Sequence, residues 1–330
     1  MRTIGCKHAA RKSLVCQPWQ MQEGSRKAII AAFFANLGIA VAKFVGFLLT
    51  ASAGLLAEAG HSLADTGNQA LLLLGSKRAK RKPTANHQFG FGNERYFWAF
   101  VVALVLFSMG GLFALYEGIQ KLIHPHEAES LGIAIGILFA AIALETFSLR
   151  TALKEVDHIK PPEMSYREFI RTAKQPELPV VLLEDIGAEI GLILALVGLL
   201  LAHFTGNARW DAVGSVAIGV LLIIIAAVLA VRMKALLIGE SASGPDQQKI
   251  SDALTSADKV ERVIHLRTVY FGPEQLMVAA KLGFAANLTV AELATAVDAA
   301  EAAVRETVPA VSLIYIEPDL YRDAASTADT

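Results

Sequence analysis

Apolar residues form six long, nearly uninterrupted stretches in the chain before about residue 240. The stretches lie near residues 28–50, 52–75, 96–118, 130–150, 179–203 and 211–237. Each is close to 20 residues long, which is the length that crosses roughly 30 Å of hydrocarbon as an α-helix. The pattern therefore predicts an α-helical membrane bundle with six transmembrane helices, in contact with a lipid bilayer on its outer face.

After about Ser241 the pattern becomes that of a small domain with mixed secondary structure. Helices are predicted near 245–260 and 289–308, and strands near 263–272, 275–284 and 312–318. The order helix, strand, strand, helix, strand predicts an open-faced α+β sandwich. Because roughly 80 residues bury only a small core, self-association as a dimer would add stability.

These patterns divide the chain into four parts. We expect a cytoplasmic N-terminal segment at 1–27, a six-helix membrane domain at 28–240, a cytoplasmic dimerisation domain at 241–318 and a disordered tail at 319–330. Lys and Arg residues crowd the second and fourth connections between the apolar stretches and are almost absent from the other three. Positively charged connections stay in the cytoplasm, so both termini should lie there.

The composition supports a membrane protein and excludes some partners. Apolar residues make up 54% of the chain and charged residues only 18%, which is too apolar for an ordinary soluble domain. The net charge of −1 gives no support to a nucleic acid partner, and none is expected. The two cysteines, Cys6 and Cys16, have no CxxC spacing, and we interpret them as free thiols on the reducing side.

Polar residues interrupt the second apolar stretch, where the sequence reads AEAGHSLADTGNQ. A charged group at the centre of a bilayer costs about 2.5–3.5 kcal/mol, so it usually faces a cavity, a partner or an ion. His61 and Asp65 are four residues apart and share one helical face, with Asn68 on nearly the same stripe. Glu58 lies one turn earlier.

The fifth stretch carries a second acidic pair, in VVLLEDIGAEIG. Asp185 and Glu189 share one face by the same spacing, whereas Glu184 is turned away by about 100°. Two helices that each present such a pair could supply four metal ligands, a set that suits Zn²⁺ and also accepts Mn²⁺ or Fe²⁺. A polar residue that stands alone in a span, such as Glu145, is more often a structural hydrogen-bond partner. The predicted metal ligands are His61, Asp65, Asp185 and Glu189.

Several segments resemble one family, the cation diffusion facilitators. They are EAGHSLADTGNQ, HQFGFGNERY, LLED and WDAVGSVAIG, and the resemblance covers about residues 28–318. It is strongest to the branch that includes zinc transporter 9. Members of this family have six transmembrane helices followed by a cytoplasmic ferredoxin-like domain, and they exchange a divalent metal ion for protons. The resemblance therefore implies the same architecture that the apolar pattern predicts.

The resemblance implies roles for individual residues and also shows one departure. His61 and Asp65 match the family's ligands in the second span, and Asp185 matches its aspartate in the fifth. Typical zinc members carry His or Asp four residues before that aspartate, where this chain has Val181, which cannot bind a metal. Glu189, Glu184 or water remain as candidates for the fourth ligand.

The implied function is secondary-active zinc efflux by proton antiport with alternating access, carried out by a homodimer in the plasma (inner) membrane. The divalent cation is then cargo and no permanently bound cofactor is expected, with Mn, Fe or Co as alternative cargo. A second hypothesis is a non-transporting scaffold, favoured by Val181. An enzyme is not expected, because the spans contain neither HExxH nor GxSxG, and no GxxxxGK[ST] motif indicates ATP hydrolysis.

The fourth ligand gives a test. If Glu189 binds the metal, Glu189→Gln should weaken metal uptake into proteoliposomes nearly as much as Asp185→Asn, because each substitution removes one charged oxygen ligand. An unchanged affinity in Glu189→Gln would remove Glu189 from the site and promote Glu184 or water.

Overall fold

The computed structural model describes residues 23–50, 53–124 and 131–320. Within these ranges it leaves out the side chains of some residues in the first two helices and at the start of α5, His61 among them. Cys6, Cys16 and most of the expected C-terminal tail lie outside the described residues. The expectations for these segments therefore stay predictions.

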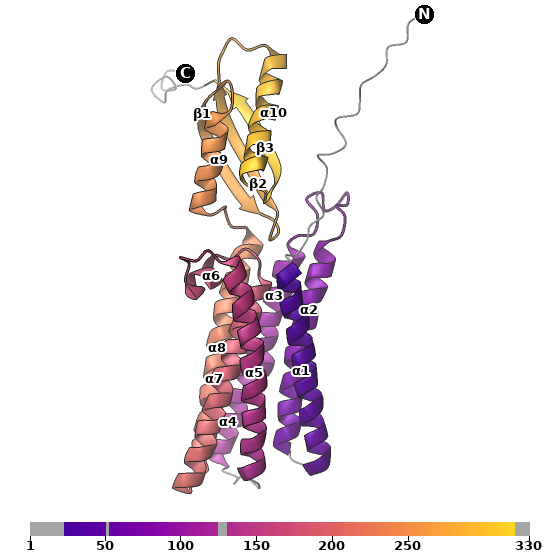
Figure 1. Cartoon of the computed structure of the whole chain (residues 1–330), viewed down its shortest axis with the longest axis vertical. Helices are drawn as coiled ribbons and strands as arrows, with labels where there is room; N and C mark the ends of the chain where they lie inside the picture. Colours follow the sequence, from indigo (N-terminus) through magenta and orange to yellow (C-terminus); the bar gives the residue numbers. More distant parts are fainter. Residues whose placement is uncertain (1–22, 51–52, 125–130, 321–330) are drawn as a thin grey trace, which may run out of the picture.

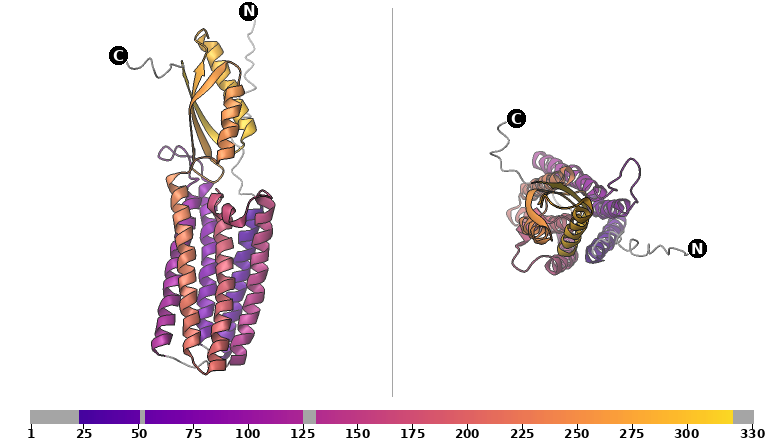
Figure 2. Two further views of the ribbon diagram at one scale, coloured as in Figure 1. Left: turned by 90° about the vertical axis from the view of Figure 1, so that its left-hand side faces the viewer. Right: turned by 90° about the horizontal axis from the view of Figure 1, so that it is seen from above.

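The first part of the chain is a bundle of long helices that lie side by side (Figures 1 and 2). Within the described part of the chain, four segments are long and apolar enough to cross a membrane, namely Glu94–Ile123, Ala134–Ile159, Glu177–Thr205 and Arg209–Ile238. A π-helical segment, η1 (Leu106–Leu112), joins two α-helices into the first of them. Together with the two N-terminal helices, these four segments confirm the six-helix bundle. The third span consists of α3 (Glu94–Val105), η1 and α4 (Phe113–Ile123). The other five spans are α1 (Glu23–Thr50), α2 (Ala53–Ala79), α5 (Leu131–Ile159), α7 (Glu177–Thr205) and α8 (Arg209–Ile238).

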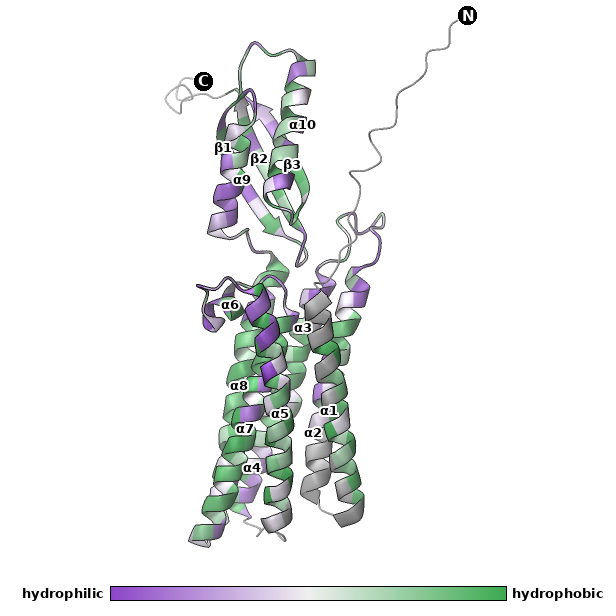
Figure 3. Ribbon diagram, in the orientation of Figure 1, coloured by the Kyte–Doolittle hydropathy of each residue, from purple (hydrophilic) through white to green (hydrophobic). Residues whose placement is uncertain are grey.

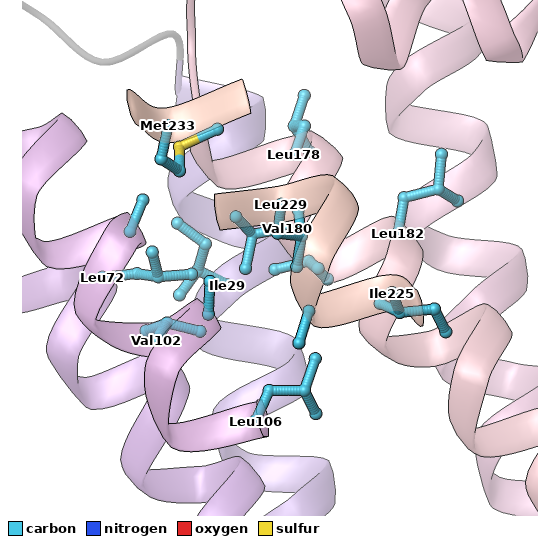
Figure 4. Packing of buried hydrophobic residues seen from close by; sticks show 14 of the residues in the cluster. Ile29, Leu72, Val102, Leu106, Leu178, Val180, Leu182, Ile225, Leu229 and Met233 are labelled. Atoms are coloured by element: carbon cyan, nitrogen blue, oxygen red, sulfur yellow. The ribbon is translucent and has the colours of Figure 1, made fainter. Parts of the chain in front are cut away.

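Most residues of the bundle are apolar, and polar residues gather at the end of the bundle next to the second domain (Figure 3). Figure 4 shows the packing where α2, α3, α7 and α8 meet. Leu72, Val102, Val180 and Leu229 are almost completely buried there. Since lipid tails are as apolar as these side chains, close packing rather than water exclusion holds the helices together.

Glycines allow two helices of the bundle to approach each other closely. A Cβ atom on Gly219 of α8 would lie 2.6 Å from the backbone nitrogen of Leu115, and one on Gly118 of α4 would lie 2.7 Å from that of Val216. Backbone atoms cannot move aside as a flexible side chain can. The contact between α4 and α8 therefore depends on small residues at both positions.

The C-terminal domain has the predicted order of elements: α9 (Gly244–Ser256), β1 (Val260–Tyr270), β2 (Leu276–Phe284), α10 (Val290–Thr307) and β3 (Val311–Asp319). The strands form one sheet in the order β1-β2-β3, with β1 antiparallel and β3 parallel to β2. Both helices cover the same face of the sheet (Figures 1 and 2). On the opposite face Tyr315 is exposed, so the domain is the open-faced α+β sandwich that the sequence predicts.

A short helix in the fourth connection, α6 (Tyr166–Thr172), is absent from the sequence prediction. Its seven residues are too few to show a helical period. Ser165 begins the helix, because its side chain accepts a hydrogen bond from the backbone N–H of Glu168, and Phe169 anchors it by burial. The connection is thus an ordered part of the bundle's end.

Polar contacts hold the connection between the bundle and the C-terminal domain. The Glu240 carboxylate, just after α8, accepts hydrogen bonds from Lys174, at 2.7 Å, and from Arg232. Burial alone would raise the pKa of Glu240, but these two cations hold the pKa below its ordinary value. Nearby, Gln175 donates a hydrogen bond of 3.1 Å to Glu274, in the turn between β1 and β2.

A substitution at the α4–α8 contact tests how much the bundle depends on it. We expect Gly219→Ala to destabilise the protein by about 1–3 kcal/mol, the usual cost of overpacking. Gly136→Ala in α5 is the matched control, because a Cβ atom there meets nothing within 4 Å. The control should be neutral or slightly stabilising, since alanine favours a helix by up to about 1 kcal/mol over glycine. Thermal unfolding in detergent compares the two, and equal midpoints would contradict the expectation.

Candidate metal centre

The polar residues of α2 form one stripe that faces the inside of the bundle. Asp65 is partly buried, whereas Asn68 is 2% and Gln69 0% exposed. Residues 61, 65, 68 and 69 follow the spacing i, i+4, i+7, i+8, which places them on one helical face. The backbone of His61 continues this stripe by one turn, and its side chain lies outside those that the structure describes.

Glu184 of α7 meets this stripe directly. Asn68 Nδ2 donates a hydrogen bond of 2.8 Å to Glu184 Oε1, and Gln69 Nε2 donates one of 3.2 Å to Glu184 Oε2. Each oxygen of the carboxylate therefore has its own amide donor. The Glu184 side chain is only 8% exposed, so these hydrogen bonds form in the interior of the bundle.

Asp185 is even more deeply buried, at 3% exposure, and points toward α5. Ser148 Oγ donates a hydrogen bond of 3.0 Å to Asp185 Oδ2. Electrostatic repulsion acts between the Asp185 carboxylate and the carboxylates of Glu145 and Asp65, and Glu184 is repelled by the same two residues. Four acidic side chains from α2, α5 and α7 thus share one region of the bundle, and we call Asp65, Glu145, Glu184 and Asp185 the acidic cluster.

Glu189 lies one helical turn beyond Asp185 along α7. Its Oε1 atom accepts a hydrogen bond of 2.9 Å from Thr146 Oγ1 of α5. In this conformation Glu189 is therefore directed to α5 and not to α2.

The structure brings together some of the residues that the sequence predicts and leaves others untested. It places Asp65 and Asp185 in one cluster and joins them to Glu184. Val181, at the position of the missing family ligand, is 1% exposed and belongs to the apolar core. Among the described residues, no three His, Cys, Asp or Glu side chains are arranged to hold a metal ion together in this conformation. The complete predicted ligand set thus stays a prediction.

Three polar residues of this region, Gln69, Glu145 and Ser148, were not predicted from the sequence. Gln69 extends the stripe of His61 by the same helical period and could have been found from that spacing. Glu145, interpreted as an isolated structural residue, lies three residues before Ser148, and this spacing puts both on one face of α5. Which face of α5 meets α7 was not visible in the sequence.

A buried ion pair lies at the end of α7 nearest the C-terminal domain. Arg95, at the start of α3, donates hydrogen bonds from two nitrogens to the two oxygens of Glu177, and one of them measures 2.8 Å. The exposed fractions are 7% for Arg95 and 1% for Glu177. Glu177 precedes Glu184 by seven residues, which is two helical turns. The pair therefore fixes α7 against α3 on the side of the acidic cluster nearest the C-terminal domain.

The chemistry of the acidic cluster suits a cation. Buried carboxylates that repel one another are stabilised by a bound divalent ion, which carboxylate oxygens coordinate at about 2.0–2.6 Å depending on the ion. Manganese, iron, cobalt and zinc all accept such oxygen ligands, and an imidazole would favour the later members of this series. Glu145, Glu184 and Asp185 are buried, whereas Asp65 is partly exposed.

The helical bundle, its apolar lipid-facing surface and the separate α+β domain define an integral multi-pass membrane protein with an acidic site between its helices. Residues 29–238 match the family model of the cation efflux transmembrane domain, and residues 242–319 match that of the cation efflux protein, cytoplasmic domain. The chain belongs to the cation efflux family. The resemblance inferred from the sequence motifs is thereby confirmed.

Characterised relatives cover most of this chain. The proton-coupled zinc antiporter SLC30A9, mitochondrial, of Xenopus laevis is 32% identical over 263 residues, which are 79% of this chain and 47% of that protein. Its Homo sapiens counterpart is 30% identical over 79% of this chain and 46% of its own length. Metal tolerance protein C4 of Arabidopsis thaliana is 28% identical over 81% of this chain and 58% of that protein. The chain spans about half the length of the first two relatives.

The buried ion pair predicts an asymmetry between single and double substitutions. Glu177→Gln should destabilise the protein by about 3–5 kcal/mol, because it leaves the Arg95 guanidinium buried without its counter-charge. Replacing both residues, with Arg95→Met and Glu177→Leu, should cost much less, since no unpaired charge remains. Thermal unfolding of the detergent-solubilised protein measures both. A double variant as unstable as the single one would contradict this account.

Proposed function

We propose that this chain is a secondary-active transporter that exports a divalent metal cation, zinc in the first place, in exchange for protons. The observation that carries the proposal is the acidic cluster, in which Asp65, Glu184 and Asp185 lie together inside an apolar bundle. Carboxylates in such a place are costly unless they serve an ion or a proton pathway. Membership of the cation efflux family and the names of the relatives support the same function.

We propose His61, Asp65 and Asp185 as ligands of the transported cation. For the fourth ligand the contacts favour Glu184 over Glu189, because Glu184 reaches α2 while Glu189 is bound to Thr146 of α5. Glu189 then lies on the outward side of the site, where it can receive the released ion.

The ligand chemistry couples the cation to protons. An imidazole must be neutral and a carboxylate ionised to bind a metal ion, so binding expels protons and release readmits them. Alternating access requires the helices that carry the site to move against each other, opening it first to one side and then to the other. A cation that draws α2 and α7 together supplies the differential contact that such a transition needs.

The other expectations follow from the same proposal. Residues 28–240 would carry out transport and residues 241–318 would form a homodimer through the uncovered face of the sheet. The end of the bundle next to the α+β domain would face the cytoplasm, because Lys77, Lys80 and Lys82 are exposed there. Residence in the plasma (inner) membrane stays a prediction, and the animal relatives named above are mitochondrial.

A non-transporting scaffold is the second candidate, and Val181 is the observation that favours it. Its side chain is buried in the apolar core and offers no ligand where typical family members have one. A site left incomplete by this residue would hold a cation too weakly to complete a cycle. The α+β domain would then serve only to recruit partners.

Metal uptake into proteoliposomes distinguishes the two candidates. Purified protein is reconstituted with a pH-sensitive dye inside the vesicles, and Zn²⁺, Mn²⁺, Fe²⁺ and Co²⁺ are offered separately. We expect zinc uptake accompanied by proton movement in the opposite direction, and at least about a hundredfold loss of uptake in Asp65→Ala, since a lost charged ligand removes several kcal/mol of cation binding. Uptake of another metal in preference to zinc would correct the cargo, whereas no uptake of any metal by a folded dimer would favour the scaffold.

A further inference from the structure

Glu184 accepts more side-chain hydrogen bonds than its acidic neighbours on α7, Asp185 and Glu189. Both of its oxygens accept a hydrogen bond from an amide of α2, at 2.8 Å and 3.2 Å. Asp185 accepts one side-chain hydrogen bond, from Ser148, and Glu189 one, from Thr146. The second oxygen of Glu189 is buried with no hydrogen-bond partner in the part of the chain that the structure describes.

The two amides that hold Glu184 have no other evident role. Asn68 and Gln69 are essentially buried, and their carbonyl oxygens lack a hydrogen-bond partner among the described residues. Among the described residues, the side chains of Asn68 and Gln69 form hydrogen bonds only to Glu184. Burying an amide is unfavourable unless it forms a hydrogen bond, and Glu184 is the acceptor that offsets this cost for both amides.

The carboxylate needs these donors because of its neighbours. Asp65, Asp185 and Glu145 all repel it. A glutamate side chain has three rotatable bonds, and without the amides it would turn away from this repulsion at little cost. Two hydrogen bonds from adjacent residues, one to each oxygen, fix the Glu184 carboxyl group in one orientation.

We propose that Asn68 and Gln69 are positioning residues for the transported cation. They hold the Glu184 carboxyl group near Asp65 and Asp185, so its oxygens are already oriented before the cation binds. Less side-chain entropy is then lost on binding. This inference rests on the proposed transport function, and it assigns the two amides to cation affinity. Neither amide is a ligand in this proposal, because each acts through Glu184.

Uptake kinetics in proteoliposomes test the proposal. Asn68→Leu and Gln69→Met keep the approximate size of each side chain and remove the donor. Each should raise the KM for Zn²⁺ about tenfold, the effect of one lost hydrogen bond to a charged group, with a smaller change in kcat. Thr146→Val is the matched control, since it removes a hydrogen bond between a hydroxyl and the α7 carboxylate Glu189. Its KM should stay within about threefold of the parent, because Glu189 lies outside the acidic cluster.

An exchange of acid and amide separates positioning from simple helix bonding. In the double variant Asn68→Asp with Glu184→Gln, an amide and a carboxylate again face each other across α2 and α7, but the carboxylate is on the wrong helix. We expect the thermal unfolding midpoint to return to the parent value while the KM stays raised. Recovery of both would show that the bond only joins the helices, and would overturn the proposal.

The remaining outcomes are also decisive. Parental uptake that is lost in Asp185→Asn establishes the transport function independently of the amides. An unchanged KM in both Asn68→Leu and Gln69→Met, against that background, would overturn the positioning role and leave the transport function intact. No uptake by the parent protein would overturn the transport function itself. If Asn68→Leu does not fold, as judged by its elution and unfolding in detergent, Gln69→Met alone carries the same comparison.

Discussion

An ionised carboxylate inside an apolar helical bundle is tolerated only where donors or a cation surround it, and the centre of this protein is organised by that constraint. Glu184 faces two amides of α2, Asp185 faces a hydroxyl of α5, and Glu189 faces another. Each of these three acidic residues thus accepts a hydrogen bond from a neighbouring helix. The hydrogen bonds that make the acids tolerable also determine how α2 and α5 lie against α7.

The same helix is fixed by an ion pair at its N-terminal end, next to the α+β domain. Arg95 and Glu177 form a buried pair of charges with two hydrogen bonds, which leaves α7 little freedom to rotate against α3. Directly above this pair, Gly92 and the turn at Gly272 come so close that a Cβ on Gly272 would lie 2.9 Å from the Gly92 Cα. The α+β domain therefore rests on the connection that leads into α3. A movement of α7 would reach this contact through Arg95.

Much of the architecture could be predicted from the pattern of residues. Six apolar stretches of membrane length and the change of pattern after Ser241 are strong signals, because lipid and a small sheet demand very different sequences. α6 escaped prediction because seven residues show no period, and η1 because its apolar sequence LFSMGGL is also compatible with an α-helix. For the site, the spacing of Asp65 and Asn68 was visible in the sequence. The sequence did not show which of Glu184 and Glu189 contacts α2, because both lie on α7 and periodicity does not reveal how α7 is rotated against α2.

The sequence alone determined which residues must be shielded from lipid, because a charge in an apolar helix has a high cost wherever the helix lies. It thereby singled out the polar residues of α2 and α7 and the family to which the chain belongs. Only the tertiary structure decided which of them meet, since periodicity defines a face of a helix but not the helix that it faces. The contact of Glu184 with Asn68 and Gln69, and the entry of Glu145 from α5, depend on how the helices are rotated and staggered when they pack. These quantities arise from the close packing of all the helices together.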